Sequence, residues 1–319
     1  MKGGIACIGE CMIELSQLDL PGGHARLGFA GDTLNTAIYL SRLLPGRISY
    51  VTNLGQDAFS TRMVEVFTAE EIDCTFVGRH ESLLPGLYSI EVDSTGERSF
   101  RYWRDNSAAR TLFSGLGAAF SDLSRFGVIY LSGITLAILP SDVRAALIAN
   151  LMGMRDAGHQ IVFDSNYRPR LWADQAGARA AFAEMWKVCT LALPSFDDEE
   201  ALYPGTSLTQ VLDRIAASGV PEIILKNGAA GPLIRQNGRD VQTMFERSGT
   251  VIDTTGAGDS FNAGYIASRL LGAEPEVAAR AGHELACSVI AQHGAILPRQ
   301  LMMHRSKVSG TERTAVDDA

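Results

Sequence analysis

The sequence predicts an α/β fold of three layers, in which helices cover both faces of a mainly parallel sheet. Short apolar runs typical of buried strands alternate with stretches of helical spacing along most of the chain. Such alternation indicates right-handed crossovers, and it places ligands beyond the carboxyl ends of the strands. One β-hairpin interrupts the alternation, which predicts a small additional sheet outside the main one.

The expected elements follow one another in a regular order. Strands are predicted at 4–9, 48–52, 128–131, 160–164, 189–193 and 222–226. Helices are predicted between them at 34–44, 58–71, 141–157, 177–188 and 208–218. Near the C-terminus, the apolar run 250–252 is interpreted as a strand end that leads into a helix over 260–271, and a further apolar helix is expected at 281–292.

The predicted hairpin joins a strand at 87–92 to a strand at 97–104 through a loop that contains glycine. Side chains alternate between the two faces of a strand, so Tyr88 lies on one face of the first strand, and Tyr102 and Arg104 share a face of the second. A hairpin of this kind can serve as a lid that excludes water from a ligand. The alternative interpretation is an ordinary amphipathic hairpin on the surface.

Composition and charge exclude several classes of protein. The chain has 319 residues, 46% of them hydrophobic, with a net charge of −8, which argues against nucleic acid as a partner. No run approaches the roughly 18 apolar residues that span a bilayer, and no secretory signal is evident, so a cytoplasmic protein without membrane contact is expected. Five scattered cysteines and six histidines form no metal-binding motif, so no structural metal is expected.

The segment 253–262 (D-T-T-G-A-G-D-S-F-N) carries the strongest chemical information. It predicts that the amides of Gly256, Ala257 and Gly258 lie unpaired at the start of a helix, where they can bind an anion. Asp259 is then placed to take a proton from an attacking hydroxyl. The alternative is a glycine-capped turn, with an aspartate favoured by the helix dipole.

This ten-residue string resembles the C-terminal motif of the ribokinase-like (PfkB) carbohydrate kinases. The resemblance implies a ribokinase-like three-layer sandwich with a small β-sheet lid, ATP as the phosphoryl donor, and Asp259 as the catalytic base. It also implies a kinase domain over 1–304 with lid strands inserted at about 11–30 and 75–106. The polar segment 305–319 is expected to be a loosely held tail.

A second motif, F-A-G-D-T-L-N-T-A at 29–37, resembles the first motif of the same family. The resemblance implies that Gly31, Asp32 and Asn35 hold substrate hydroxyls. The family has a glycine where this chain has Ala30, which departs slightly from the pattern. Asp32 is also a candidate helix N-cap.

Two arginines point to an acidic substrate, because guanidinium groups suit carboxylates. Arg104 belongs to the predicted lid, and Arg168 follows the apolar run 161–163. The alternative for Arg168 is an ion pair with a surface acid.

Motifs spread over residues 4–300 resemble the subgroup of this family that acts on 2-keto-3-deoxy sugar acids. In that subgroup, residues that match Tyr88, Tyr102, Arg104 and Arg168 contact the sugar acid. The implied reaction is phosphorylation of 2-dehydro-3-deoxy-D-gluconate at its terminal hydroxyl. A kinase of the galactonate epimer, of fructose or of ribose stays open, as does a non-catalytic module that binds a sugar acid.

The resemblance also assigns the nucleotide and metal sites. The nucleotide is expected at a set of residues that share glycine turns or strand ends: Asn166, Lys226, Gly228, Gly231, Gly256 and Gly258. The metal-positioning motif of the family corresponds to D-D-E-E at 197–200, in which Asp197 and Glu200 would hold Mg²⁺ through water. An acidic helix N-terminus is the alternative for these acids. Dependence on a monovalent cation stays open, and a homo-oligomer is expected by analogy.

Overall fold

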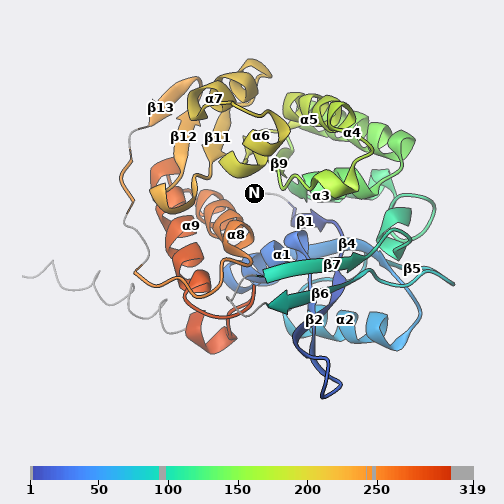
Figure 1. Cartoon of the computed structure of the whole chain (residues 1–319). Helices are drawn as coiled ribbons and strands as arrows, with labels where there is room; N and C mark the ends of the chain where they lie inside the picture. The colour runs from blue at the N-terminus through green and yellow to red at the C-terminus, as the bar shows by residue number, and fades with distance from the viewer. Residues whose placement is uncertain (1–2, 93–97, 242, 246–248, 303–319) are drawn as a thin grey trace, which may run out of the picture.

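The computed structural model of the chain describes residues 3–92, 98–241, 243–245 and 249–302. Two sheets organise the described residues (Figure 1). The predicted tail, 305–319, lies outside the described residues. None of the helices that the structure describes combines the length and apolar composition needed to cross a bilayer.

The larger sheet has nine strands in the order β13-β12-β11-β10-β9-β8-β1-β4-β5. From β11 to β5 the strands are parallel, and β12 and β13 continue the sheet antiparallel. Their bounds are β1 Ile5–Ile8, β4 Ile48–Leu54, β5 Val77–Arg79, β8 Val128–Ser132, β9 Gln160–Asp164, β10 Leu191–Ala192, β11 Glu222–Leu225, β12 Leu233–Gln236 and β13 Arg239–Val241. The predicted mainly parallel sheet is therefore confirmed.

Helices cover both faces of this sheet (Figure 1). Their bounds are α1 Asp32–Leu43, α2 Ala58–Ala69, α3 Gly133–Ile138, α4 Ser141–Asp156, α5 Gln175–Val188, α6 Phe196–Leu202, α7 Leu208–Ala217, α8 Ala257–Leu270 and α9 Pro275–Ile290. Short 3₁₀ helices lie at Ala108–Thr111, Phe120–Arg125, Pro169–Leu171 and Gly228–Ala230. All the helices predicted from spacing form, with ends that differ by up to six residues, the largest difference being at the start of α9.

Side chains alternate between the two faces of β1, and this shows how the two layers of helices are held against the larger sheet. Ala6 and Ile8 pack into the hydrophobic cluster under α4, α5 and α7, whereas Ile5 and Cys7 pack into the cluster under α1, α2, α8 and α9. All four side chains are fully buried. A strand that is buried on both faces consists of consecutive apolar residues, so it can be predicted from the sequence.

The smaller sheet has the order β3-β2-β6-β7, with β2 Met12–Asp19, β3 His24–Ala30, β6 Leu87–Val92 and β7 Arg98–Trp103. β6 and β7 form the predicted antiparallel hairpin, in which Tyr88 pairs with Tyr102. Directly paired residues share a face, as the period of two requires. We call this smaller sheet the lid. β5 falls within the range 75–106 but belongs to the edge of the larger sheet.

One predicted element is absent. Residues 250–252 are not a strand: the amide of Ile252 donates to the carbonyl of Ile290 at the end of α9, 2.7 Å away. Val251 is 61% exposed, so its apolar side chain does not mark a buried strand. An irregular segment therefore leads into α8.

Candidate active site

The site is built around the start of α8. Gly256 is the N-cap of this helix and has a left-handed backbone, with φ +76°. A Cβ at this position would lie 2.9 Å from atoms of Ala295. Glycine is therefore required for two reasons, the positive φ and the close backbone approach. The turn fixes the direction of α8 and with it the position of Asp259 in the first turn.

Asp259 is held by α1, which lies beside α8. The Asn35 amide donates to Asp259 Oδ2 over 2.8 Å, and the Thr36 hydroxyl donates to the Asp259 carbonyl over 3.2 Å. Burial raises the pKa of the Asp259 carboxyl to about 8, and the nearby Asp32 contributes to the increase, whereas the hydrogen bond from Asn35 opposes it. A carboxyl with such a pKa can exchange a proton near neutral pH.

The amides at this turn differ from the prediction in one respect. The Ala257 amide donates to the Thr254 carbonyl over 3.2 Å, so it is not unpaired. Within the described residues, the Gly256 and Gly258 amides have no hydrogen-bond acceptor. Amides without an acceptor at a helix start attract anions. Gly256 and Gly258 are thus better candidates for the anion site than Ala257.

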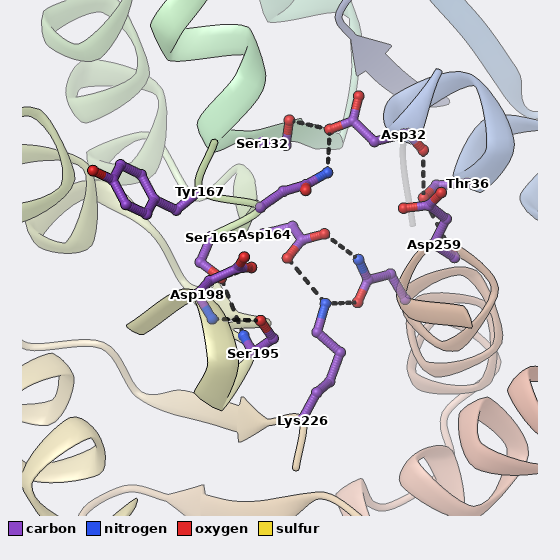
Figure 2. A network of polar contacts seen from close by, with 12 residues as sticks. Asp32, Thr36, Ser132, Asp164, Ser165, Tyr167, Ser195, Asp198, Lys226 and Asp259 are labelled. Atoms are coloured by element: carbon purple, nitrogen blue, oxygen red, sulfur yellow. Dashed lines mark hydrogen bonds and ion pairs between the residues drawn. The ribbon is translucent and has the colours of Figure 1, made fainter. Parts of the chain in front are cut away.

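Asp32 begins α1, and Gly31 precedes it as the N-cap. Asp32 Oδ2 accepts a hydrogen bond from the Ser132 hydroxyl and another from the Asn166 amide, the latter over 2.7 Å (Figure 2). Burial raises the pKa of the Asp32 carboxyl. The N-cap role considered for Asp32 is wrong, because Gly31 occupies that position.

A network of hydrogen bonds joins the ends of β9 and β11 to α8 (Figure 2). Lys226, just after β11, donates to Asp164 Oδ1 at the end of β9 over 2.9 Å and to the Asn262 amide oxygen over 3.0 Å. Asn262 in turn donates to Asp164 Oδ2 over 2.8 Å and to the Tyr130 hydroxyl over 3.1 Å. Both oxygens of the buried Asp164 are thus satisfied. A Cβ at Gly258 would lie 3.6 Å from the Lys226 ammonium, so this cation lies close to the turn.

The other glycines of the predicted nucleotide site lie on the turn between β11 and β12. Gly228 and Gly231 both have positive φ, +50° and +81°. A Cβ at Gly231 would lie 2.7 Å from Phe245, whereas a Cβ at Gly228 would meet nothing within 4 Å. Gly228 therefore leaves open space at this turn. Asn166 differs from the rest, because its amide donates to Asp32 at the start of α1.

The lid contributes an aromatic face. The rings of Tyr88 and Tyr102 lie 5.7 Å apart, and Phe100 stacks on Tyr102 at 6.4 Å. The hydroxyl of Tyr88 donates to the carboxylate of Glu14 on β2. This contact joins β6 to Glu14 of β2 within the lid. Tyr102 is 44% exposed, so it is free to contact a ligand.

Arg104 lies where the lid joins the larger sheet, and it forms a buried ion pair. Its Nη2 donates to Glu10 Oε2, and the two side chains are only 5% and 1% exposed. Arg104 Nε and Glu10 Oε1 are buried and have no hydrogen-bond partner among the residues that the structure describes. The structure therefore places this predicted substrate residue against an acid of the chain itself.

Arg168 is the more accessible of the two predicted arginines, with half of its side chain exposed. Its Nη1 donates to Asp198 Oδ1 over 3.2 Å. Asp198 also accepts a hydrogen bond from Ser165, over 3.0 Å, next to Asp164 (Figure 2). Burial raises the pKa of the Asp198 carboxyl, Arg168 opposes this shift, and Asp164 adds to it.

The four consecutive acids on α6 separate into two groups. Asp197 and Glu200, the predicted metal residues, are exposed. Asp198 turns toward the site, and Glu199 is fully buried and pairs with Arg214 over 2.6 Å. Ser195 is the N-cap of α6, and this fixes which acid faces inward. Among the described residues no cluster of three or more metal-ligating side chains occurs.

Sequence reasoning missed several residues of the site: Thr36, Tyr130, Asp164, Asp198 and Asn262. Asp164 and Asn262 carried a detectable signal, because each stands next to a predicted strand end or within the glycine motif. Thr36 lies within the motif at 29–37 but was not singled out there, and Tyr130 lies inside β8, where the sequence had no such signal.

The chain is similar to known carbohydrate kinases. The model of the pfkB family carbohydrate kinases matches residues 2–301. The 2-dehydro-3-deoxygluconokinase of Escherichia coli K12 is 44% identical over 95% of this chain and 99% of its own length. The enzyme of the same name from Dickeya dadantii is 42% identical, over 93% and 98%.

Solved structures show the same fold. A fructokinase from Xylella fastidiosa with bound ATP superposes with a TM-score of 0.82 at 18% identity, over 97% of this chain and 100% of its own. A ribokinase from Thermotoga maritima has a TM-score of 0.74 at 21% identity, over 95% and 99%. The fold is ribokinase-like, and the chain belongs to the pfkB family of carbohydrate kinases.

Proposed function

We propose that this protein is an ATP-dependent kinase that phosphorylates the terminal hydroxyl of 2-dehydro-3-deoxy-D-gluconate to give the 6-phosphate. The observation that carries the proposal is the position of Asp259, held 2.8 Å from Asn35 at the glycine turn of α8. The choice of substrate is supported by relatives at 39–44% identity over nearly the whole chain, which are all named for that activity.

In the proposed reaction Asp259 accepts the proton of the substrate hydroxyl as that oxygen attacks the γ-phosphorus of ATP. The bond between the γ-phosphorus and the bridging oxygen breaks, and ADP leaves. The pKa of about 8 suits a base that works near neutral pH. The amides of Gly256 and Gly258 stabilise the charge on the transferred phosphoryl group, a contribution worth roughly 10²–10³ in rate in comparable sites. Lys226, close to the turn, adds positive charge on the nucleotide side.

The sugar acid is proposed to lie between α1 and the lid. Gly31, Asp32 and Asn35 would bind its hydroxyl groups, and Tyr88 and Tyr102 would contact its carbon chain. Arg168 is proposed to bind the carboxylate, because half of its side chain is exposed. Such a charge-assisted hydrogen bond contributes roughly 1.5–3 kcal/mol.

Arg104, already paired with Glu10, has a different proposed task. It is expected to set the position of the lid, which brings Tyr102 over the substrate. Its contribution to binding the carboxylate is secondary.

Asp164 at the end of β9 and Asp198 in the first turn of α6 are suitable ligands for Mg²⁺. Asp164 and Asp198 supply carboxylate oxygens, which this ion prefers, and Mg²⁺ keeps several waters and needs few protein ligands. Their mutual repulsion raises the pKa of Asp198 beyond the effect of burial, and a cation between them would relieve it. When bound, Mg²⁺ would neutralise charge on the ATP phosphates. We propose that these two acids, rather than the exposed Asp197 and Glu200, hold it through water.

The proposal also includes the location of the protein, its assembly and its dependence on a monovalent cation. A reaction that consumes ATP is expected in the cytoplasm, and a homo-oligomer is expected by analogy with related kinases. Dependence on a monovalent cation is tested by replacing K⁺ with a large organic cation in the assay.

A coupled assay of ADP release tests the proposed function. The gluconate-derived keto acid should give the highest kcat/KM, and the galactonate-derived epimer, fructose and ribose should give lower values. A higher kcat/KM with a neutral sugar would contradict the choice of substrate. Binding of the keto acid without ADP formation would favour a non-catalytic module.

A further inference from the structure

A cavity lies at the amino ends of β1, β4 and β8, at the edge of the larger sheet opposite the candidate active site. Gly4 precedes β1, Arg47 precedes β4 and Phe126 lies just before β8, and all three line the cavity. Its volume is about 500 Å³, within the range of roughly 300–1,000 Å³ of pockets for small ligands. The reactants of the proposed kinase reaction bind beyond the carboxyl ends of the strands, so that reaction does not use this cavity.

Four charged side chains of opposite sign line the cavity: Arg47, Arg125, Glu71 and Asp73. In the part of the chain that the structure describes, no ion pair joins either arginine to either acid. Arg125 instead lies 3.6 Å from Asp122, and Glu71 pairs with Arg299. The cavity therefore keeps cationic and acidic groups apart, which suits a ligand that carries both charges.

Asp73 is oriented before any ligand arrives. Its Oδ1 accepts from the amide and the hydroxyl of Thr75, over 3.0 and 2.6 Å, and its Oδ2 accepts from the Ser49 hydroxyl over 2.8 Å. Burial favours a higher pKa, but these hydrogen bonds outweigh burial and lower the pKa of Asp73, so the carboxylate is charged near neutral pH. A carboxylate has about four lone-pair sites, and the one that is left on Oδ2 can accept from a ligand.

Glu71 follows the end of α2 in a left-handed backbone, with φ +59°. Glycine is favoured at this position of a helix, because a side chain is strained there. The Glu71 amide donates to the Thr68 carbonyl over 3.0 Å, and Arg299 donates to Glu71 Oε1. Among the described residues no donor reaches Glu71 Oε2, so this oxygen is a second acceptor for a ligand.

The cationic groups are also placed by the fold. The Arg47 carbonyl accepts from the Ile5 amide over 2.8 Å, which ties the backbone of Arg47 to β1. The Arg47 side chain has no ion pair within the described ranges of the chain, so its guanidinium is available to a ligand. The central carbon of Arg125 lies 5.9 Å from the centre of the Phe76 ring, and this contact orients a second cation at the same cavity.

We propose that this cavity binds a small zwitterion of the free amino acid type, with its carboxylate on Arg47 and its ammonium group on Asp73 and Glu71. A guanidinium fork matches a carboxylate, and an ammonium group offers three donors. ATP and a sugar acid carry negative charge and no ammonium group, so the two acids of the cavity repel them. Binding at this site is therefore independent of the proposed function.

Calorimetric titration with L-methionine tests the site in solution. Methionine should bind, whereas its analogue without the ammonium group and its analogue without the carboxylate should each bind at least tenfold more weakly, because each leaves one side of the cavity unpaired. Equal affinity for methionine and for either analogue would overturn the proposal, as would the absence of methionine binding.

Variants locate the binding in the cavity. Arg47→Gln and Glu71→Gln should each weaken methionine binding at least tenfold. The exposed pair of Arg62 and Glu65 on α2 supplies matched controls, because Arg62→Gln and Glu65→Gln remove the same charges outside the cavity and should leave the affinity unchanged. Equal affinities of the Arg47→Gln and Arg62→Gln proteins, both shown to be folded by thermal unfolding, would overturn the proposal.

Crystals of the unaltered protein soaked in free selenomethionine give a test that needs no variant. The expected result is an anomalous peak in the cavity, and a peak only elsewhere would overturn the proposal. A peak without calorimetric binding would mean binding at crystal concentration only and would also overturn it. Saturating ATP or keto acid should not displace methionine from the cavity, and displacement by either would contradict the assignment. Failure to form ADP would count against the proposed function alone.

Discussion

The two sides of the candidate active site hold buried charge in different ways. At the carboxyl edge of the large sheet, both oxygens of Asp164 accept hydrogen bonds, from Lys226 and Asn262. Where the lid joins that sheet, the pair of Glu10 and Arg104 leaves one oxygen and one nitrogen without a partner in the described part of the chain. A fully satisfied network rigidifies its residues, whereas each buried group left without a partner carries a desolvation cost. The better satisfied charges therefore lie on the side where phosphoryl transfer is proposed.

Breaking the incomplete pair should give the largest effect. Arg104→Met leaves the buried Glu10 carboxylate without its cation, which is expected to lower the free energy of unfolding by about 3–5 kcal/mol. The double variant Glu10→Gln, Arg104→Met should recover much of that loss, because no uncompensated charge stays buried. Urea unfolding of the two single variants and the double variant measures the coupling. Additive losses would show that the pair does not interact.

On the side where phosphoryl transfer is proposed, the most specific prediction concerns Asp259. Asp259→Asn keeps the shape but removes the base, so kcat should fall at least ~100-fold with little change in ATP affinity. Asp142→Asn is a matched control, because Asp142 also lies in the first turn of a helix, α4, and is exposed. Near-normal turnover of the Asp259 variant in the coupled assay would remove Asp259 from the role of base.

Arg168 tests whether specificity for an acid comes from this exposed cation. Arg168→Ala should raise KM for the keto acid about tenfold, in line with the loss of roughly 1.5–3 kcal/mol, and change KM for a neutral sugar little. Arg170→Ala, two residues further along, serves as a control for charge alone. Equal increases for acid and neutral sugars would contradict the carboxylate assignment.

The pH dependence tests the raised pKa of Asp259. Because the pKa of Asp259 is about 8 in the free protein, kcat/KM should decrease about tenfold per pH unit below that value. The raised pKa also means that the folded protein retains a proton that the unfolded chain has lost. The contribution of Asp259 to stability is thus present below about pH 4 and is lost as pH rises to about 8.

Two measurements test the raised pKa of Asp259. The kcat/KM of the unaltered protein should rise between pH 6 and 8, whereas the residual activity of Asp259→Asn should be flat. The free energy of unfolding of Asp259→Asn should decline less over pH 4 to 8. A flat profile for the unaltered protein would contradict an elevated pKa.

Much of the fold could be predicted because buried parallel strands read as apolar runs. The prediction failed at 250–252, where Val251 is exposed, because an apolar run does not reveal whether anything covers it. Within the site, the sequence indicated which residue types are present, but it did not indicate which way their side chains point. Successive side chains of a helix point about 100° apart, so only the position of the N-cap Ser195 decides that Asp198 faces inward rather than Asp197.

The hydrogen bond between Asn35 and Asp259 joins residues 224 positions apart. During synthesis on the ribosome, a nascent chain that has reached residue 250 already contains every strand of both sheets, yet α1 has no partner for Asn35 or Thr36. Long-range contacts of this kind form late and slowly. Premature termination before α8 would therefore yield a chain that exposes the apolar side of α1, which makes such a fragment a target for chaperones and proteases rather than a weak enzyme.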